Sequence, residues 1–233
     1  MVADLLGSSC TNPEMHAALK DKLLISICAG LSVPQIHSIL CAPDPINPSV
    51  PSSSSSSSSS PPRSPCHIIR AMPNTASLIR QSMTVLHTPS PPLPMHLAKL
   101  TRWIFAQIGL VTELPSSASM DPPTALCGSG PAFCALMIEA LADGAVAMGL
   151  TRQEAILMAA QTMKGAAGLV LAGEHPAVVK EKVATPGGCT MAGLMVLEEK
   201  AVRGAISLAV REATTVAAEM GGGRPPANGT RRG

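Results

Sequence analysis

Short, unbroken apolar runs mark the first half of the chain. Residues 23–30 (LLISICAG) form such a run and end in glycine, which is typical of a strand buried on both faces. The apolar positions of residues 33–40 follow helical spacing, with Pro34 in the first turn. A strand, a glycine turn and a helix in this order predict a βα unit of a parallel sheet.

Three further strands are expected in this half, at residues 66–70, 83–87 and 111–114. Between the last two, residues 95–109 have the period of an amphipathic helix. Its apolar side is predicted to consist of Leu97, Leu100, Ile104, Phe105 and Ile108. Strands that alternate with helices place residues 1–114 in the α/β class.

From residue 116 onward, no segment has the alternation of a strand. Helices are predicted at residues 131–148, 151–171, 176–183, 190–199 and 202–220. The second begins with a capping box, in which Thr151 precedes Glu154 by three positions. The first is apolar nearly all round and is therefore expected to be central. Its only charges, Glu139 and Asp143, are either a carboxylate pair at a site or, as we favour, the wet or interface side of the helix.

Two segments lack any such pattern. Residues 42–65 combine several prolines with nine consecutive serines and are predicted to be a disordered insert. Residues 221–233 are predicted to be a flexible basic tail. The expected organisation is therefore an α/β domain over residues 1–114, an all-helical domain over residues 115–220, and the tail.

Composition narrows the function classes. Net charge is only +2 and no basic run contains interleaved aromatic residues, so no nucleic-acid partner is expected. The seven cysteines form no C-x-x-C motif and no zinc-like cluster, which predicts free, mostly buried thiols, no metal and a reducing, cytoplasmic compartment. No uncharged apolar run is long enough to span a membrane, and the first residues make a poor secretory signal.

Two places have the character of a ligand site. In residues 185–199 (TPGGCTMAGLMVLEE), a glycine turn leads into a helix, where free backbone N–H groups favour a carboxylate or phosphate. From spacing alone, an anion site and a plain helix corner are about equally favoured. Asn74 and Thr75 follow the strand at residues 66–70, and they are either at a ligand-binding strand end or in an ordinary turn.

Four blocks of this sequence resemble the pyrroline-5-carboxylate reductases, which make L-proline. They are LKDKLLISICAG (19–30), RAMPNTASLIRQSMTVL (70–86), TALCGSGPAFCALMIEALADGAVAMGL (124–150) and VATPGGCTMAGLMVLEE (183–199). The resemblance implies a Rossmann-type domain that binds NADPH or NADH, followed by a helical domain that forms a homodimer and assembles further in many members. The implied reaction is hydride transfer to the C=N carbon of Δ1-pyrroline-5-carboxylate.

The same resemblance implies roles for individual residues. Thr185, Gly187, Gly188 and Thr190 are expected to hold the substrate carboxylate, and the two threonine hydroxyls are the candidate catalytic groups. The cofactor side is expected to be lined by Ala29, Gly30, Met72, Asn74, Thr75 and Thr124. Cys127 stands where the family commonly has serine.

One family feature is missing from the sequence. No G-x-G-x-x-G loop, which would bind the dinucleotide phosphates, is present, and Gly7 is the only glycine before Gly30. We therefore hypothesise that the first βα elements of the cofactor domain are absent or replaced and that this chain binds NAD(P)H poorly. Two functions remain open: an imine reductase of proline biosynthesis, and a silent family member that retains only the oligomerising helical domain.

Overall fold

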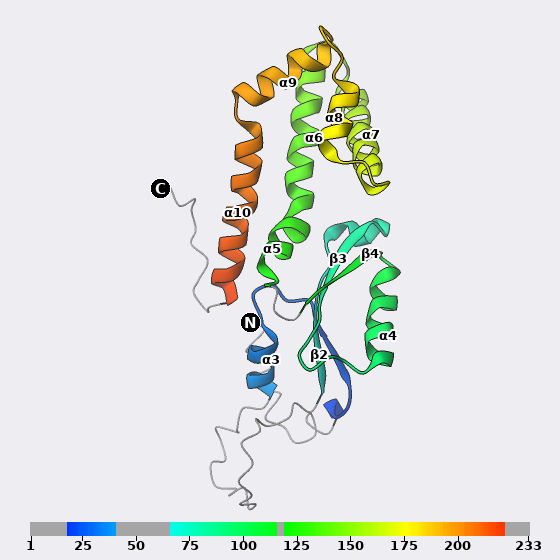
Figure 1. Ribbon diagram of the computed structural model, residues 1–233, viewed down its shortest axis with the longest axis vertical. Coiled ribbons are helices and arrows are strands. Elements are labelled where there is room, and N and C mark those ends of the chain that lie inside the picture. The colour runs from blue at the N-terminus through cyan, green and yellow to red at the C-terminus, as the bar shows by residue number, and fades with distance from the viewer. Residues whose placement is uncertain (1–17, 41–65, 116–118, 222–233) are drawn as a thin grey trace, which may run out of the picture. The chain divides into compact units, whose positions relative to one another are not determined.

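The computed structural model describes residues 18–40, 66–115 and 119–221 (Figure 1). The predicted disordered insert and almost all of the predicted tail lie outside these residues. The chain divides into two compact units, one formed by Met1–Gly128 with Thr214–Gly233 and the other by Ser129–Ala213. One helix runs through the division at residue 128, so the predicted domain limit at residue 114 stays a prediction.

A four-stranded sheet with the order β1-β2-β3-β4 forms the centre of the first unit. Its strands are β1 (Leu23–Ser26), β2 (His67–Met72), β3 (Ser82–His87) and β4 (Gly109–Leu114). β1 and β2 are parallel, as are β3 and β4, whereas β2 and β3 are antiparallel. The predicted α/β class is confirmed, and the β1–α3–β2 segment is the parallel βα unit that the sequence predicted.

Two helices cover opposite faces of this sheet, α3 (Val33–Leu40) and α4 (Met95–Ala106) (Figure 1). Successive residues of β2 point to opposite faces. Ile68 packs with Ile36 and Leu40 of α3, whereas Ile69 shares a core cluster with Phe105 of α4. A strand buried on both faces requires the continuous apolar run that predicted β2.

The predicted apolar face of α4 is partly wrong. Leu100 and Ile104 are exposed, and the fully buried position is Thr101, one residue after Leu100. The Thr101 hydroxyl donates to the Leu97 carbonyl at 2.8 Å. Because this bond satisfies the polar group inside the helix, threonine is buried there at little cost.

The helix predicted to begin at Pro131 begins about ten residues earlier. It starts as α5 (Asp121–Pro123), widens into a π-helical turn η2 (Thr124–Ser129), and continues as α6 (Gly130–Ala147). The predicted start at Pro131 left out residues 121–130. Pro122 and Pro123 are tolerated there because they stand in the first helical turn, and the π turn precedes Pro131.

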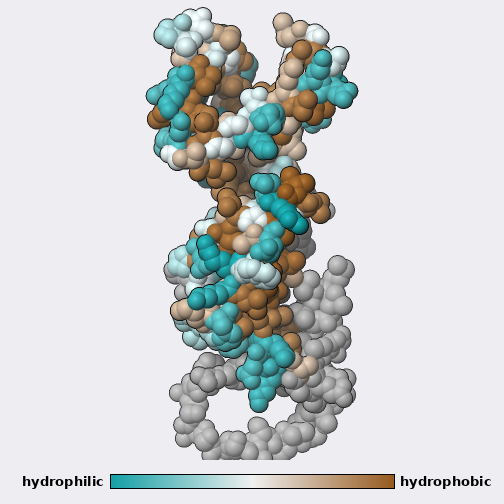
Figure 2. Space-filling view, turned by 90° about the vertical axis from the view of Figure 1, so that its right-hand side faces the viewer, coloured by the Kyte–Doolittle hydropathy of each residue, from teal (hydrophilic) through white to brown (hydrophobic). Residues whose placement is uncertain are grey.

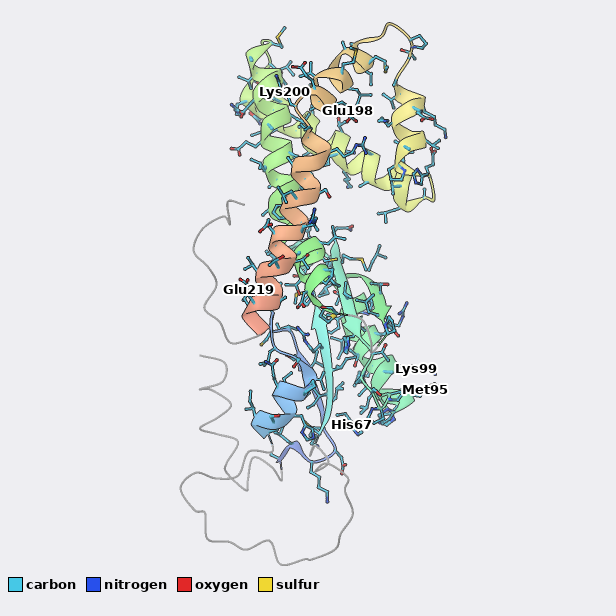
Figure 3. The ribbon with its side chains drawn as sticks, turned by 60° about the vertical axis from the view of Figure 1, so that its left-hand side comes forward. His67, Met95, Lys99, Glu198, Lys200 and Glu219 are labelled. Atoms are coloured by element: carbon cyan, nitrogen blue, oxygen red, sulfur yellow. The ribbon has the colours of Figure 1, made fainter. Side chains whose placement is uncertain are left out.

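The second unit consists of helices and contains no strand within its residues 129–213. After α6 come α7 (Arg152–Leu171), α8 (Pro176–Val183), α9 (Cys189–Glu199) and α10 (Val202–Gly221), whose last residues belong to the first unit. The capping box of Thr151 and Glu154 is formed at the start of α7. At the corner between α9 and α10, where Glu198 and Lys200 lie, Arg203 pairs with Glu198 at 2.8 Å (Figure 3).

The prediction that the apolar helix α6 is central is wrong for this chain taken alone. Its only buried residue is Ala142, whereas Leu136, Leu141 and other large side chains of the same helix are exposed. Figure 2 shows apolar surface on the helical unit. Asp143 pairs with Arg152, and both side chains stay half-exposed. This agrees with the solvent or interface side of the helix that we favoured for Glu139 and Asp143.

One helix among the described residues, Asp121–Ala147, is long and apolar enough to cross a bilayer by length and composition. A soluble helix with a covered apolar surface passes the same test, and this helix contains Glu139 and Asp143. The expected absence of a membrane partner therefore stays a prediction. Among the cysteines, Cys66 is buried as expected, whereas Cys134 and Cys189 are exposed.

The capping box makes the stability of the chain depend on pH. The pKa of Glu154 is lowered because its carboxylate accepts hydrogen bonds from the Thr151 hydroxyl and backbone N–H. Since the folded pKa lies below the unfolded one, this stabilisation is present above the unfolded pKa and is lost as pH falls through the folded pKa.

We therefore expect Glu154→Ala to lower the melting temperature at pH 7 and to have little effect at pH 3. Thermal unfolding followed by circular dichroism at both pH values measures the difference. Glu139→Ala, at an exposed position away from any helix start, is the control. An equal loss at both pH values would contradict the cap.

Candidate functional site

Most residues predicted for the cofactor side belong to the first unit and gather where β2 ends. Met72 is the last residue of β2, is only 6% exposed and shares a core cluster with Val85 and Met120. Thr75 begins the short 3-10 helix η1 (Thr75–Ile79) and is exposed. The turn η2 lies beside this strand end, since Cys127 packs against the same cluster.

Three hydrogen bonds fix Asn74 between these elements. Its backbone N–H donates to the Ser82 hydroxyl at 3.0 Å, and its side-chain oxygen accepts from the Ala76 N–H at 3.1 Å, capping η1. Its amide nitrogen donates to the Cys127 carbonyl at 3.1 Å. The sequence analysis identified Asn74 from its place after a strand but missed Ser82, whose 2% exposed hydroxyl holds it.

The π turn carries two of the residues named above. The Thr124 hydroxyl donates to the Met120 carbonyl at 2.7 Å, one turn back along the helix, so its orientation follows that of the turn. Burial raises the pKa of the Cys127 thiol, which keeps this cysteine in the protonated form at neutral pH. Cys127 is therefore a neutral packing residue here and a poor nucleophile.

Ala29 and Gly30 follow β1, where the chain turns into α3. Gly30 has a positive φ of 71°, and a Cβ added to it would lie 2.8 Å from the Met220 Cβ. The end of α10 therefore packs directly against this turn, and Gln35 donates to the Gly221 carbonyl. Ala29 is exposed.

A pocket of about 430 Å³ opens beside this turn within the first unit. Its wall includes the start of α3 at Ser32 and Gln35, together with Arg70, Ser119 and Asp121. The Arg70 guanidinium is 8% exposed and donates to the Cys28 carbonyl at 3.4 Å. Burial lowers the pKa of Arg70, while the charge of Asp121 acts in the opposite direction. No site role was predicted for Arg70, although a cation in the strand residues 67–72 (HIIRAM) was a sequence signal for a buried charge at a site.

Apart from the acidic Asp121, these residues are of kinds that bind a phosphorylated ligand. The pocket offers a buried cation, hydroxyl groups and the start of a helix, which are groups that bind phosphate and ribose oxygens. No G-x-G-x-x-G loop leads into a helix in the described part of the first unit. Among the described residues, no group of three or more His, Cys, Asp or Glu is arranged to hold a metal ion.

The residues predicted for the substrate lie in the second unit, in the turn between α8 and α9. Gly187 has a positive φ of 70°, and Gly188 is the N-cap residue of α9. The Gly188 N–H donates to the Thr185 carbonyl at 3.0 Å, and the Thr185 hydroxyl oxygen lies 2.6 Å from the position that a Cβ on Gly188 would take. No side chain caps the start of α9, so the first N–H groups of this helix are available to an acidic ligand.

Met72, Asn74, Thr124 and Cys127 lie together in the first unit. Thr185, Gly187, Gly188 and Thr190 lie in the second unit. The assignment of these residues to cofactor and substrate remains a prediction at this point.

The chain thus has a sheet with a parallel βα unit, followed along the sequence by helices with a glycine turn between two of them. This order defines a class of proteins with an α/β part and an all-α part. Residues 117–220 match the family model described as pyrroline-5-carboxylate reductase dimerisation. A pyrroline-5-carboxylate reductase of Lophium arboricola is 58% identical over 93% of this chain and 64% of its own length. One of Neurospora crassa is 52% identical over 99% of this chain and 67% of its own length. The chain belongs to the pyrroline-5-carboxylate reductase family.

Solved structures agree with this assignment. The Plasmodium falciparum pyrroline carboxylate reductase with NADP bound has a TM-score of 0.74 and 28% identity, over 94% of this chain and 78% of that one. A Coxiella burnetii pyrroline-5-carboxylate reductase has a TM-score of 0.75 and 29% identity, over 92% and 72%. The chain spans less than two thirds of the Lophium arboricola protein (64%) and 67% to 78% of the other three proteins.

Proposed function

We propose that this protein acts in the reduction of Δ1-pyrroline-5-carboxylate to L-proline with NADPH or NADH. The observation that carries the proposal is the glycine turn before α9. Its geometry combines an uncapped helix start, a neighbouring threonine hydroxyl and a backbone without side chains at Gly187 and Gly188. A small cyclic imino acid has the carboxylate that such a turn binds.

In this proposal, the N–H groups at the start of α9 and the hydroxyls of Thr185 and Thr190 hold the substrate carboxylate. The nucleotide supplies the hydride when bound. The ring nitrogen of the imine gains a proton during reduction, and a threonine hydroxyl or a water molecule held by it donates this proton. Alignment of the nicotinamide with the imine carbon accounts for most of the rate acceleration in such a reaction, because no covalent intermediate with the protein is needed.

The residues proposed for the cofactor side are Ala29, Gly30, Met72, Asn74, Thr75 and Thr124. The pocket with Arg70 is proposed to bind oxygen atoms of the nucleotide. The first unit also supports a limit on the affinity for the nucleotide, since the end of α10 packs directly on Gly30. We therefore propose weak binding of NADPH and NADH by this chain.

The helical unit is proposed to form a homodimer. Supporting this, many large apolar side chains of α6, α7 and α9 are exposed in the single chain, Leu136, Leu157 and Met195 among them. An exposed apolar surface of this kind marks an interface. The unpaired cysteines fit a reducing cytoplasmic compartment.

The test is NADPH oxidation by the purified full chain, followed by absorbance with Δ1-pyrroline-5-carboxylate as substrate, together with titration of nicotinamide fluorescence. Turnover that requires the imine supports the proposal. Thr190→Ala is expected to raise KM for the imine strongly. Micromolar affinity for NADPH would contradict the proposed weak cofactor binding.

A second candidate is a catalytically silent family member that retains the oligomerising helical unit. The exposed apolar side chains of its helices support the oligomerising part of this candidate. Light scattering distinguishes the two functions when combined with the assay: a dimer without imine-dependent turnover supports the second candidate, and turnover excludes it.

A further inference from the structure

The carbonyl of Cys127 occupies an unusual position in its helix. In an α-helix it would accept the N–H of the residue four positions later, which is Pro131. Proline has no N–H, so this bond cannot form. The π turn Thr124–Ser129, which contains Cys127, ends two residues before Pro131.

A donor from another part of the fold supplies the missing bond. The Asn74 amide nitrogen donates to the Cys127 carbonyl at 3.1 Å across 53 positions of sequence. The other bonds of Asn74 hold this donor in place, since Ser82 of β3 accepts its N–H and Ala76 donates to its side-chain oxygen. Ser82 is almost fully buried, so the anchor belongs to the core of the sheet.

We propose that Asn74 is a positioning residue that holds the π turn and, through it, the Thr124 hydroxyl. Thr124 is tied to the Met120 carbonyl in the helical turn that leads into the π turn, and Met120 packs against Met72. A displacement of the turn therefore moves both residues. Asn74 acts on the reaction through this turn and not by binding the nucleotide with its own amide. The inference rests on the proposed function for its link to catalysis.

The test uses Asn74→Ser. Serine keeps an oxygen that accepts the Ala76 N–H, so the cap of η1 is retained, while the donor to Cys127 is lost. Asn74→Asp removes the same donor with nearly unchanged shape. The matched control is Leu78→Ala, which alters an η1 side chain that is 90% exposed and has no part in these bonds.

The first readout is hydrogen exchange of the backbone amides of residues 124–130, measured by mass spectrometry. Loss of one neutral hydrogen bond is expected to accelerate exchange about fivefold in Asn74→Ser, with no change in Leu78→Ala. The second readout compares the change in kcat with the change in the Kd for NADPH. We expect kcat to fall about 10- to 100-fold, because small misplacements at a reacting centre have effects of this size, while the Kd for NADPH stays within about twofold.

A rescue variant separates this role from general loosening. Pro131→Ala restores an N–H four residues after Cys127, which gives the carbonyl a donor within its own helix. In this background, Asn74→Ser is expected to have a much smaller effect on exchange than in the natural sequence. Equal effects in both backgrounds would overturn the proposal.

The outcomes also distinguish a failure of the role proposed for Asn74 from a failure of the proposed function. If NADPH affinity falls in Asn74→Ser while exchange of the turn is unchanged, Asn74 binds the nucleotide directly and the inference is wrong. If the natural chain has no turnover, the proposed function fails. The exchange experiment with Pro131→Ala still decides whether Asn74 holds the turn.

Discussion

Gly188→Ala is expected to reduce kcat/KM for Δ1-pyrroline-5-carboxylate by at least about 100-fold, a loss typical of a misplaced reacting group. A Cβ at this position would lie 2.6 Å from the Thr185 hydroxyl oxygen and 3.2 Å from the Thr185 carbonyl oxygen. The first contact is too short to persist, so the hydroxyl proposed to hold the carboxylate must move, and the second is tight enough that the Thr185 carbonyl must shift slightly. Steady-state kinetics and a titration with L-proline measure the loss.

The same helix offers a matched control. Gly193 lies in the middle of α9, and a Cβ there meets no atom within 4 Å. Gly193→Ala is expected to retain activity and to stabilise the helix by about 0.5–1 kcal/mol, since alanine is the better helix former. Near-natural kinetics in Gly188→Ala would show that Thr185 and the turn do not bind the substrate carboxylate.

Gly109→Ala is expected to have the largest effect on stability. Gly109 begins β4 opposite Ser82, with a φ of 150° that favours glycine. A Cβ there would lie 2.0 Å from the Ser82 carbonyl oxygen and 2.5 Å from its nitrogen. These are backbone atoms of the paired strand β3 and cannot rotate away, so the pairing of β3 with β4 must be distorted.

The expected loss is more than about 4 kcal/mol, at the extreme of single substitutions and comparable with the whole stability of a small domain. Urea unfolding followed by circular dichroism measures it. Gly165→Ala in α7, where an added Cβ meets nothing within 4 Å, is the control and should not lower stability. A loss below about 1 kcal/mol in Gly109→Ala would contradict the close pairing of β3 and β4.

The elements that the sequence predicted well are those with local signals. α3 and α7 have Pro34 and a capping box at their starts, and their observed bounds agree with the predicted ones to within one residue. The glycine turn before α9 was predicted for the same reason. A cap or a glycine turn depends on residues a few positions apart, which a pattern along the chain captures.

The features that were predicted wrongly depend on contacts that the pattern of apolar and polar residues does not contain. The π turn at 124–129 forms where Asn74 reaches the Cys127 carbonyl, a contact that no local pattern contains. Thr101 is buried because its hydroxyl is satisfied within α4, so polarity alone misplaced the face of that helix. Arg70 was missed in the site despite its charge in a buried strand, because the pocket that it lines is formed by residues far along the chain, Asp121 and Gly221 among them.

The sparse burial in the helical unit has a consequence for how its stability is measured. Among the residues of this unit, only Ala142, Ala155 and Ala159 are buried, so the single chain has almost no core of large side chains there. In the proposed dimer, this unit folds as it associates, so its free energy of unfolding includes the free energy of association. Its melting temperature then rises with protein concentration, and dilution alone unfolds it.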